Sequence, residues 1–186
     1  ILGTLALLFS KACQDPQKVL EDDNIPVTTE SFVEYAAEGN DEAVKLFIET
    51  DLDINSTNKL GDTPLTAAIR QNQFSTTKLL LKNDADTEVT DQQGLKPLII
   101  AADKGYFDIT KLLIKHGAKL DGKSENSELT PLIYASSRGH LEIVRYLIQE
   151  GVDVNNINKD GGTALMNASF YGHNNVVRYL IEQGAE

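Results

Sequence analysis

Hydrophobic residues recur at the spacing of an amphipathic helix through most of the chain. Three stretches show this spacing most clearly: Ile109, Leu112 and Leu113; Ile143, Val144, Leu147 and Ile148; and Val176, Val177, Leu180 and Ile181. Each stretch is followed by a glycine, a residue that suits the left-handed conformation at a helix end. A Thr-Pro-Leu sequence or a variant of it precedes each stretch and begins another apolar face. The pattern therefore predicts pairs of helices.

The helix pairs repeat with a period of 33 or 34 residues. The helix-start positions are 63, 96, 130 and 163, and a second series in the same register is Gly39, Asn72, Gly105, Gly139 and Gly172. A threonine before the first helical residue caps free N–H groups, and proline at the first position has no N–H to leave unpaired. Three positions depart from the pattern: Lys96 replaces the capping threonine, Asn72 replaces the helix-ending glycine, and Glu128 occupies a turn-glycine position.

This unit resembles the ankyrin repeat, whose pattern combines T-P-L-x-x-A-A, G-H, I-V, L-L and G-A-D. Residues 130–148 carry most of that pattern. The resemblance implies an all-α fold, an ankyrin-repeat solenoid of about five helix–turn–helix repeats with short hairpin loops. We assign this domain to residues 30–186, with repeats at 30–54, 55–87, 88–121, 122–154 and 155–186. The resemblance also implies a non-catalytic module that binds a protein through its concave face.

Candidate partner-binding positions follow from the repeat register, which places equivalent residues of the first helices on one face. The candidates are Ile100, Lys104, Tyr134, Arg138, Asn167, Phe170 and Tyr171. Tyrosine and arginine are enriched at the residues that dominate binding energy in interfaces. An alternative for Phe170 and Tyr171 is that both rings pack on the terminal repeat.

Charge is concentrated near the N-terminus. The net charge of the chain is −11, and residues 14–57 hold twelve acidic and only two basic side chains. Nucleic acid is therefore not expected as a partner, because phosphate binding needs clustered Lys and Arg. Because charge runs are usually solvated, the first interpretation is a solubilising linker with a polar end to the fold, and an interaction surface for a basic protein is the alternative. An inhibitor or immunity-type protein that neutralises a basic toxin or enzyme is thus an alternative function, as is an accessory factor for a periplasmic enzyme.

No motif for catalysis or metal binding is present in the sequence. His140 and His173 occupy the G-H position of the repeat, His116 precedes a helix-ending glycine, and none has a neighbouring metal ligand in sequence. Met166 falls on a predicted core position. The second helices also carry a basic row, Lys45, Lys78, Lys111, Arg145 and Arg178. We interpret it as a solvated outer face, and a stripe that binds an anionic partner is the alternative. We expect no enzyme activity, no cofactor and no metal.

The first residues form a separate segment. Residues 1–9 are almost wholly apolar and too short to span a bilayer, as in the core of an export signal. With Ala12 before Cys13, residues 1–13 resemble the end of a bacterial lipoprotein signal, in which Cys13 would carry the lipid. Lys11 and Ser10 depart from that pattern. A plain secretory signal or short anchor, or an apolar segment packed on the fold, are the alternatives.

The organisation predicted for the N-terminal part is thus a signal-like segment over residues 1–13 and an acidic linker over residues 14–29. The lipoprotein hypothesis places the protein in the periplasm or cell envelope, whereas a packed apolar segment is compatible with the cytoplasm. Contact with a membrane is expected only through this N-terminal segment, and the repeat domain is expected to be a monomer.

Overall fold

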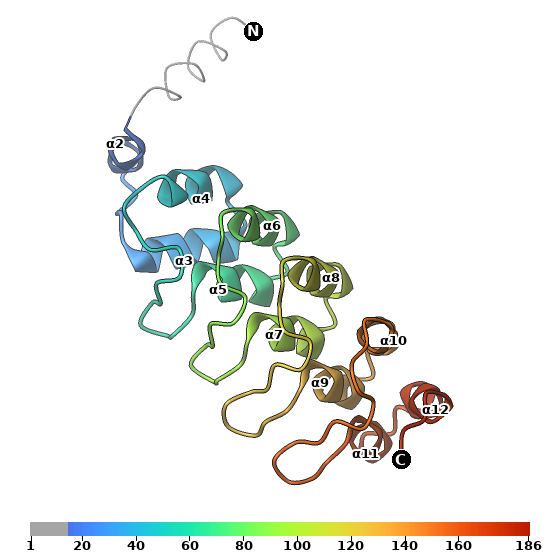
Figure 1. Cartoon of the computed structure of the whole chain (residues 1–186). Helices are drawn as coiled ribbons and strands as arrows, with labels where there is room; N and C mark the ends of the chain where they lie inside the picture. The colour runs from blue at the N-terminus through green and yellow to red at the C-terminus, as the bar shows by residue number, and fades with distance from the viewer. Residues whose placement is uncertain (1–14) are drawn as a thin grey trace, which may run out of the picture.

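The computed structural model describes residues 15–186, which fold into helix pairs stacked in one direction (Figure 1). Within this range there are eleven helices and no strand. They are α2 (Pro16–Asp22), α3 (Thr29–Glu38), α4 (Asp41–Ile48), α5 (Pro64–Arg70), α6 (Phe74–Lys82), α7 (Pro97–Lys104), α8 (Phe107–Lys115), α9 (Pro131–Arg138), α10 (Leu141–Gln149), α11 (Ala164–Phe170) and α12 (Asn174–Glu182). The predicted all-α solenoid is confirmed.

The helices form two rows (Figure 1). The inner helices α3, α5, α7, α9 and α11 pack in sequence order against one another, and the outer helices α4, α6, α8, α10 and α12 do the same. One loop connects each outer helix to the next inner helix, and these loops project beyond the inner row in Figure 1. We call residues 55–63, 88–96, 122–130 and 155–163 the finger loops. Each repeat therefore contacts only its neighbours, as in other solenoids.

Local hydrogen bonds explain where the inner helices begin. The hydroxyl oxygens of Thr63, Thr130 and Thr163 each accept a bond from the backbone N–H three residues later, at 3.1, 3.3 and 3.2 Å. Lys96 makes no such cap, and its ammonium group instead donates to a carboxylate oxygen of Glu88 at 3.0 Å. The proline after Lys96 still sets the backbone for the first turn. The sequence signal for these helix starts is confirmed.

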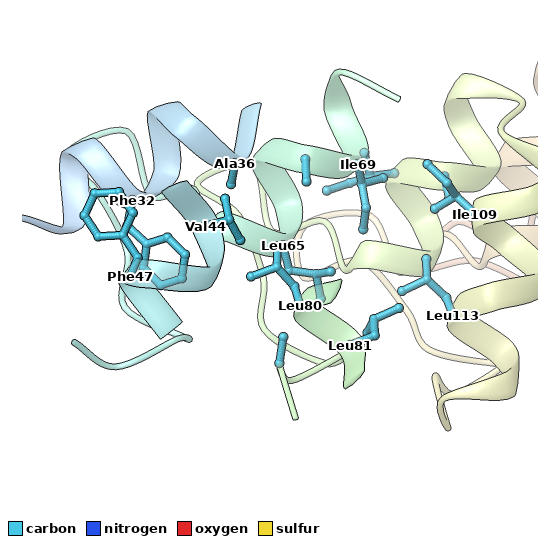
Figure 2. Close-up of a cluster of buried hydrophobic side chains, with 14 of the residues drawn as sticks. Phe32, Ala36, Val44, Phe47, Leu65, Ile69, Leu80, Leu81, Ile109 and Leu113 are labelled. Atoms are coloured by element: carbon cyan, nitrogen blue, oxygen red, sulfur yellow. The ribbon is translucent and has the colours of Figure 1, made fainter. Parts of the chain in front are cut away.

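The core lies between the two helix rows and consists of two clusters of buried apolar side chains, one in repeats one to three and one in repeats three to five. Figure 2 shows the first of them. At its N-terminal end the rings of Phe32 and Phe47 stack with centroids 5.2 Å apart. Leu65, Ile69 and Leu80 continue it through the second repeat, and all are fully buried. Burial of such side chains contributes about 1.5–3 kcal/mol each, so the stack is stabilised mainly by contacts between adjacent repeats.

The segment predicted as an acidic linker is partly folded. Residues 16–22 form α2, which packs against α4 and buries Val19 and Leu20. Asp15 caps the helix by accepting a bond from the N–H of Gln17 at 3.1 Å. The linker prediction is therefore wrong for this helix, which covers the N-terminal end of the core. Residues 1–13 and the lipidation candidate Cys13 lie outside the described residues.

Candidate partner-binding surface

The inner helices and the finger loops together form one face of the molecule, which we call the groove face. Arg138 lies at the end of α9, and its Nε donates to Oδ1 of Asp103 on α7 at 2.7 Å. This ion pair joins repeats three and four across the groove face. The Arg138 side chain is more than half exposed, so it can donate further hydrogen bonds to a partner.

An aromatic pair lies on the last repeat, and its Tyr171 is near enough to Arg138 to act on the guanidinium electrostatically. Phe170 is 83% exposed and Tyr171 is 58% exposed, and their rings meet edge to face with centroids 5.0 Å apart. The alternative in which the two rings pack into the terminal repeat is therefore not what the structure shows. The two rings place exposed apolar area beside polar residues, an arrangement that in larger patches marks interaction sites.

The surroundings shift the pKa values of two side chains in this region, Arg138 and Tyr134. The hydrogen bond and charge of Asp103 raise the pKa of the Arg138 guanidinium, with smaller contributions from Tyr171 and Tyr134. Burial raises the pKa of the Tyr134 hydroxyl, and its hydrogen bonds with the side chains of Ser124 and Ser127 act in the opposite direction. Tyr134, Arg138, Phe170 and Tyr171 form what we call the aromatic–arginine patch.

The other predicted positions have different environments. Ile100 is 1% exposed because α7 packs between α5 and α9, so its prediction as a partner-binding residue is wrong. Lys104 is exposed at the end of α7. Asn167 is half-buried, and its side-chain amide donates to the carbonyl oxygen of Thr163 at 2.9 Å, which holds it against its own helix. Met166 is 57% exposed, so the core position assigned to it is also wrong.

Two histidines form hydrogen bonds between adjacent repeats. Nε2 of His140 donates to the carbonyl oxygen of Asp103 at 3.0 Å, and Nε2 of His173 donates to that of Ser137 at 2.9 Å. Gln73, at the same register position, donates to the carbonyl oxygen of Ala37 at 3.0 Å. Each bond ties a repeat to the inner helix before it. Across residues 15–186, no group of three His, Cys, Asp or Glu is arranged to hold a metal ion.

The basic row lies on the outer helices, away from the groove face. Lys45 and Lys78 are exposed and line a shallow hollow between α4 and α6. Farther along, Lys111 pairs with Asp108 at 2.8 Å, and the Arg145 guanidinium lies 4.4 Å from the centre of the Tyr179 ring. Two of the five basic groups thus have partners within their own face.

A hollow on the groove face was not predicted from the sequence. It has a volume of about 320 Å³ and lies between α3, α5 and the first finger loop. Its lining residues are Glu30, Val33, Glu34, Ala37, Asn58, Leu60, Asp62, Ala67, Arg70 and Gln71. Leu60, an exposed apolar residue at the tip of a polar loop, is the sequence signal by which this hollow could have been found.

None of the helices in residues 15–186 is long and apolar enough to cross a membrane. Comparison with curated proteins gives no match. A family described as ankyrin repeats, in three copies, matches residues 33–124 and again residues 120–186. These matches cover most of the chain and coincide with the stacked helix pairs. The chain therefore belongs to the ankyrin-repeat family.

Proposed function

We propose that this ankyrin-repeat chain is a non-catalytic adaptor that binds a protein through the aromatic–arginine patch. The observation that carries the proposal is the exposed Phe170–Tyr171 pair beside Arg138. Ankyrin repeats indicate a protein–protein interaction module. Tyrosine and arginine supply large contact area and directional hydrogen bonds, which is why they dominate binding energy at many interfaces.

The arrangement of the patch supports this assignment. Asp103 holds the Arg138 guanidinium by one nitrogen, so the group is positioned before a partner arrives. A side chain that is already ordered loses less conformational entropy on binding, which lowers the free-energy cost of binding. Tyr134 is half-buried on the same helix, four residues before Arg138, and residues so spaced share a helix face. The patch therefore offers two exposed aromatic rings and a positioned cation to one partner.

Affinity capture tests this proposal. The wild-type chain is compared with the double variant Tyr134→Ala/Arg138→Ala in capture from envelope and soluble fractions of the source organism, followed by calorimetry with the captured protein. Loss of two interface residues of this kind weakens binding by about 2 kcal/mol or more, which is roughly thirtyfold in Kd. Circular dichroism checks that helicity is unchanged.

The matched control is Lys45→Ala/Lys78→Ala, which removes two exposed side chains from the outer helices. We expect this variant to bind as the wild type does. If the control abolishes binding while the patch variant does not, the outer basic row is the functional surface and the partner is anionic.

We also propose that the adaptor is exported and tethered to the cell envelope through a lipid on Cys13. The support is the apolar run of residues 1–9 followed by Ala12 and Cys13. The test expresses the chain behind an initiator methionine and a short lysine-containing segment in a Gram-negative host with labelled palmitate. Label should enter the wild type and not Cys13→Ser. Equal labelling of both, or of neither, contradicts this localisation.

A further inference from the structure

The hollow between α3, α5 and the first finger loop combines apolar walls with an acidic rim. Val33 and Ala67 are buried in its walls, and Leu60 stands at its mouth with 66% of its surface exposed. Glu30, Glu34 and Asp62 are its acidic lining residues. We call this site the N-terminal hollow. It accommodates one long side chain rather than a folded element, because its volume is only about 320 Å³.

The negative charge of the rim is only partly neutralised within the chain. Arg70, the one basic lining residue, is shared between two carboxylates: its Nε donates to Oδ1 of Asp62 at 3.2 Å, and another guanidinium nitrogen pairs with Asp91. Lys59 lies 3.9 Å from Glu30, but both side chains are exposed, where ion pairs are weak. Within residues 15–186, Glu34 forms no ion pair.

Like charges also repeat along α3. Glu30, Glu34 and Glu38 are spaced four residues apart, so they share one helix face, and all three are exposed. Like-charged pairs at this spacing destabilise a helix by a few tenths of a kcal/mol each. A cation between the carboxylates of Glu30 and Glu34 would relieve that repulsion. It would also neutralise part of the negative charge at the rim of the hollow.

The first finger loop is fixed in place at the mouth of the hollow. Oδ1 of Asn58 accepts bonds from the N–H groups of Leu60 and Asp62 at 2.9 and 3.0 Å, which closes the turn. The hydroxyl groups of Ser56 and Thr29 lie 3.2 Å apart and join the loop to α3. The hollow is therefore formed before binding.

We infer that the N-terminal hollow binds a lysine or arginine side chain of the protein partner. The aliphatic stem of such a residue packs against Val33, Ala67 and Leu60, while its charged head meets the carboxylates of Glu30 and Glu34. Lysine and arginine bury their stems on apolar surface in this way while the head stays in polar surroundings. The inference rests on the proposed protein-binding function and adds that the partner is basic where it contacts repeats one and two.

A matched peptide series tests the inference. The probe is a short peptide of glycine, serine and leucine with one central arginine, an acetylated N-terminus and an amidated C-terminus. It is compared with the same peptide carrying norleucine or glutamate in place of the arginine. Amide NMR of the isotope-labelled full chain should show shifts at Val33, Glu34, Ala37 and Leu60 with the arginine peptide. Glu30→Gln/Glu34→Gln should weaken that binding about fivefold, which corresponds to about 1 kcal/mol. Added NaCl should weaken it as well.

The control variant Glu142→Gln/Glu182→Gln makes the same charge change at exposed positions of the outer helices and should leave peptide binding unchanged. The Tm should change little, because relief of repulsion within α3 offsets the loss of the Glu30 charge from its first turn. An unchanged Tm shows that weaker binding is not due to unfolding. Equal affinity for the arginine and norleucine peptides overturns the inference, as does equal weakening by the control variant.

The two proposals fail separately. Tyr134→Ala/Arg138→Ala alters the opposite end of the groove face and should not change binding of the arginine peptide. If the captured partner needs the aromatic–arginine patch but binds Glu30→Gln/Glu34→Gln with wild-type affinity, the proposed function stands and the basic-contact inference is wrong. If the arginine peptide binds the hollow but the captured partner binds both double variants with wild-type affinity, the adaptor proposal is wrong in its choice of patch.

Discussion

At the scale of single residues, the left-handed position between the two helices of a repeat has two constraints. Gly139 has a φ of 76°, which a residue with a Cβ adopts only with strain. A Cβ at Gly139 would also lie 2.5 Å from Nδ1 of His173 in the next repeat. The same imidazole donates through Nε2 to the carbonyl oxygen of Ser137. The glycine therefore makes room for the histidine that ties repeat five to repeat four.

Gly139→Ala should lower the free energy of unfolding by about 2–3 kcal/mol. Of this, about 1–2 kcal/mol comes from the left-handed backbone, and about 1 kcal/mol comes from displacement of His173 and loss of its hydrogen bond. In a His173→Ala background the collision is absent, so the same substitution should cost only the backbone share. Urea denaturation of the four chains of this double-mutant cycle measures the difference. Equal penalties in both backgrounds would show that the imidazole does not press on this position.

At the scale of elements, α2 shows how a short helix is stabilised by tertiary contact. It has seven residues, which is too short for an isolated helix to be stable in water. Its order comes from the Asp15 cap and from burial of Val19 and Leu20 against the first repeat. The helix therefore serves as a cap that shields the end of the apolar core from water.

Leu20→Ala should destabilise the fold by about 2–4 kcal/mol, the usual range for truncation of a fully buried leucine. Lys18→Ala is the control within the same helix, because Lys18 is exposed and should change stability by less than about 0.5 kcal/mol. Thermal and urea unfolding of the full chain measure both. Equal stability of the two variants would mean that α2 does not cap the first repeat.

Sequence signals succeeded where the cause is local. The starts at Thr63 and Thr130 rest on hydrogen bonds within three residues, so the pattern of residues is sufficient to predict them. The folding of α2 depends on a surface offered by α4, and two apolar residues among acids give no periodic signal. The burial of Ile100 likewise depends on how closely α9 approaches α7. The Asp103–Arg138 pair joins residues of different repeats, which register alone does not orient.

At the scale of the whole molecule, the two ends of the stack differ. The N-terminal end is covered by α2, whereas the last helix pair exposes apolar residues at positions that inner repeats bury. Five of the seven large hydrophobic residues exposed in residues 15–186 belong to the last repeat: Ile157, Met166, Phe170, Tyr171 and Ile181. In a linear stack each repeat is stabilised by its neighbours, and within residues 15–186 the pair α11–α12 packs on one neighbouring repeat alone. In a chain of these residues, α11 and α12 should open at lower free energy than the central helices.

Met166 and Ile133 occupy the same register position on α11 and α9, yet they are 57% and 1% exposed. Ile133→Glu buries an unpaired carboxylate between two repeats and should lower the free energy of unfolding by more than about 4 kcal/mol. Met166→Glu leaves the carboxylate in water and should change stability by less than about 0.5 kcal/mol. Urea unfolding of the isolated chain compares the two directly. A large loss for Met166→Glu would mean that this face is covered in solution, and a concentration-dependent loss would identify the cover as a second copy of the chain.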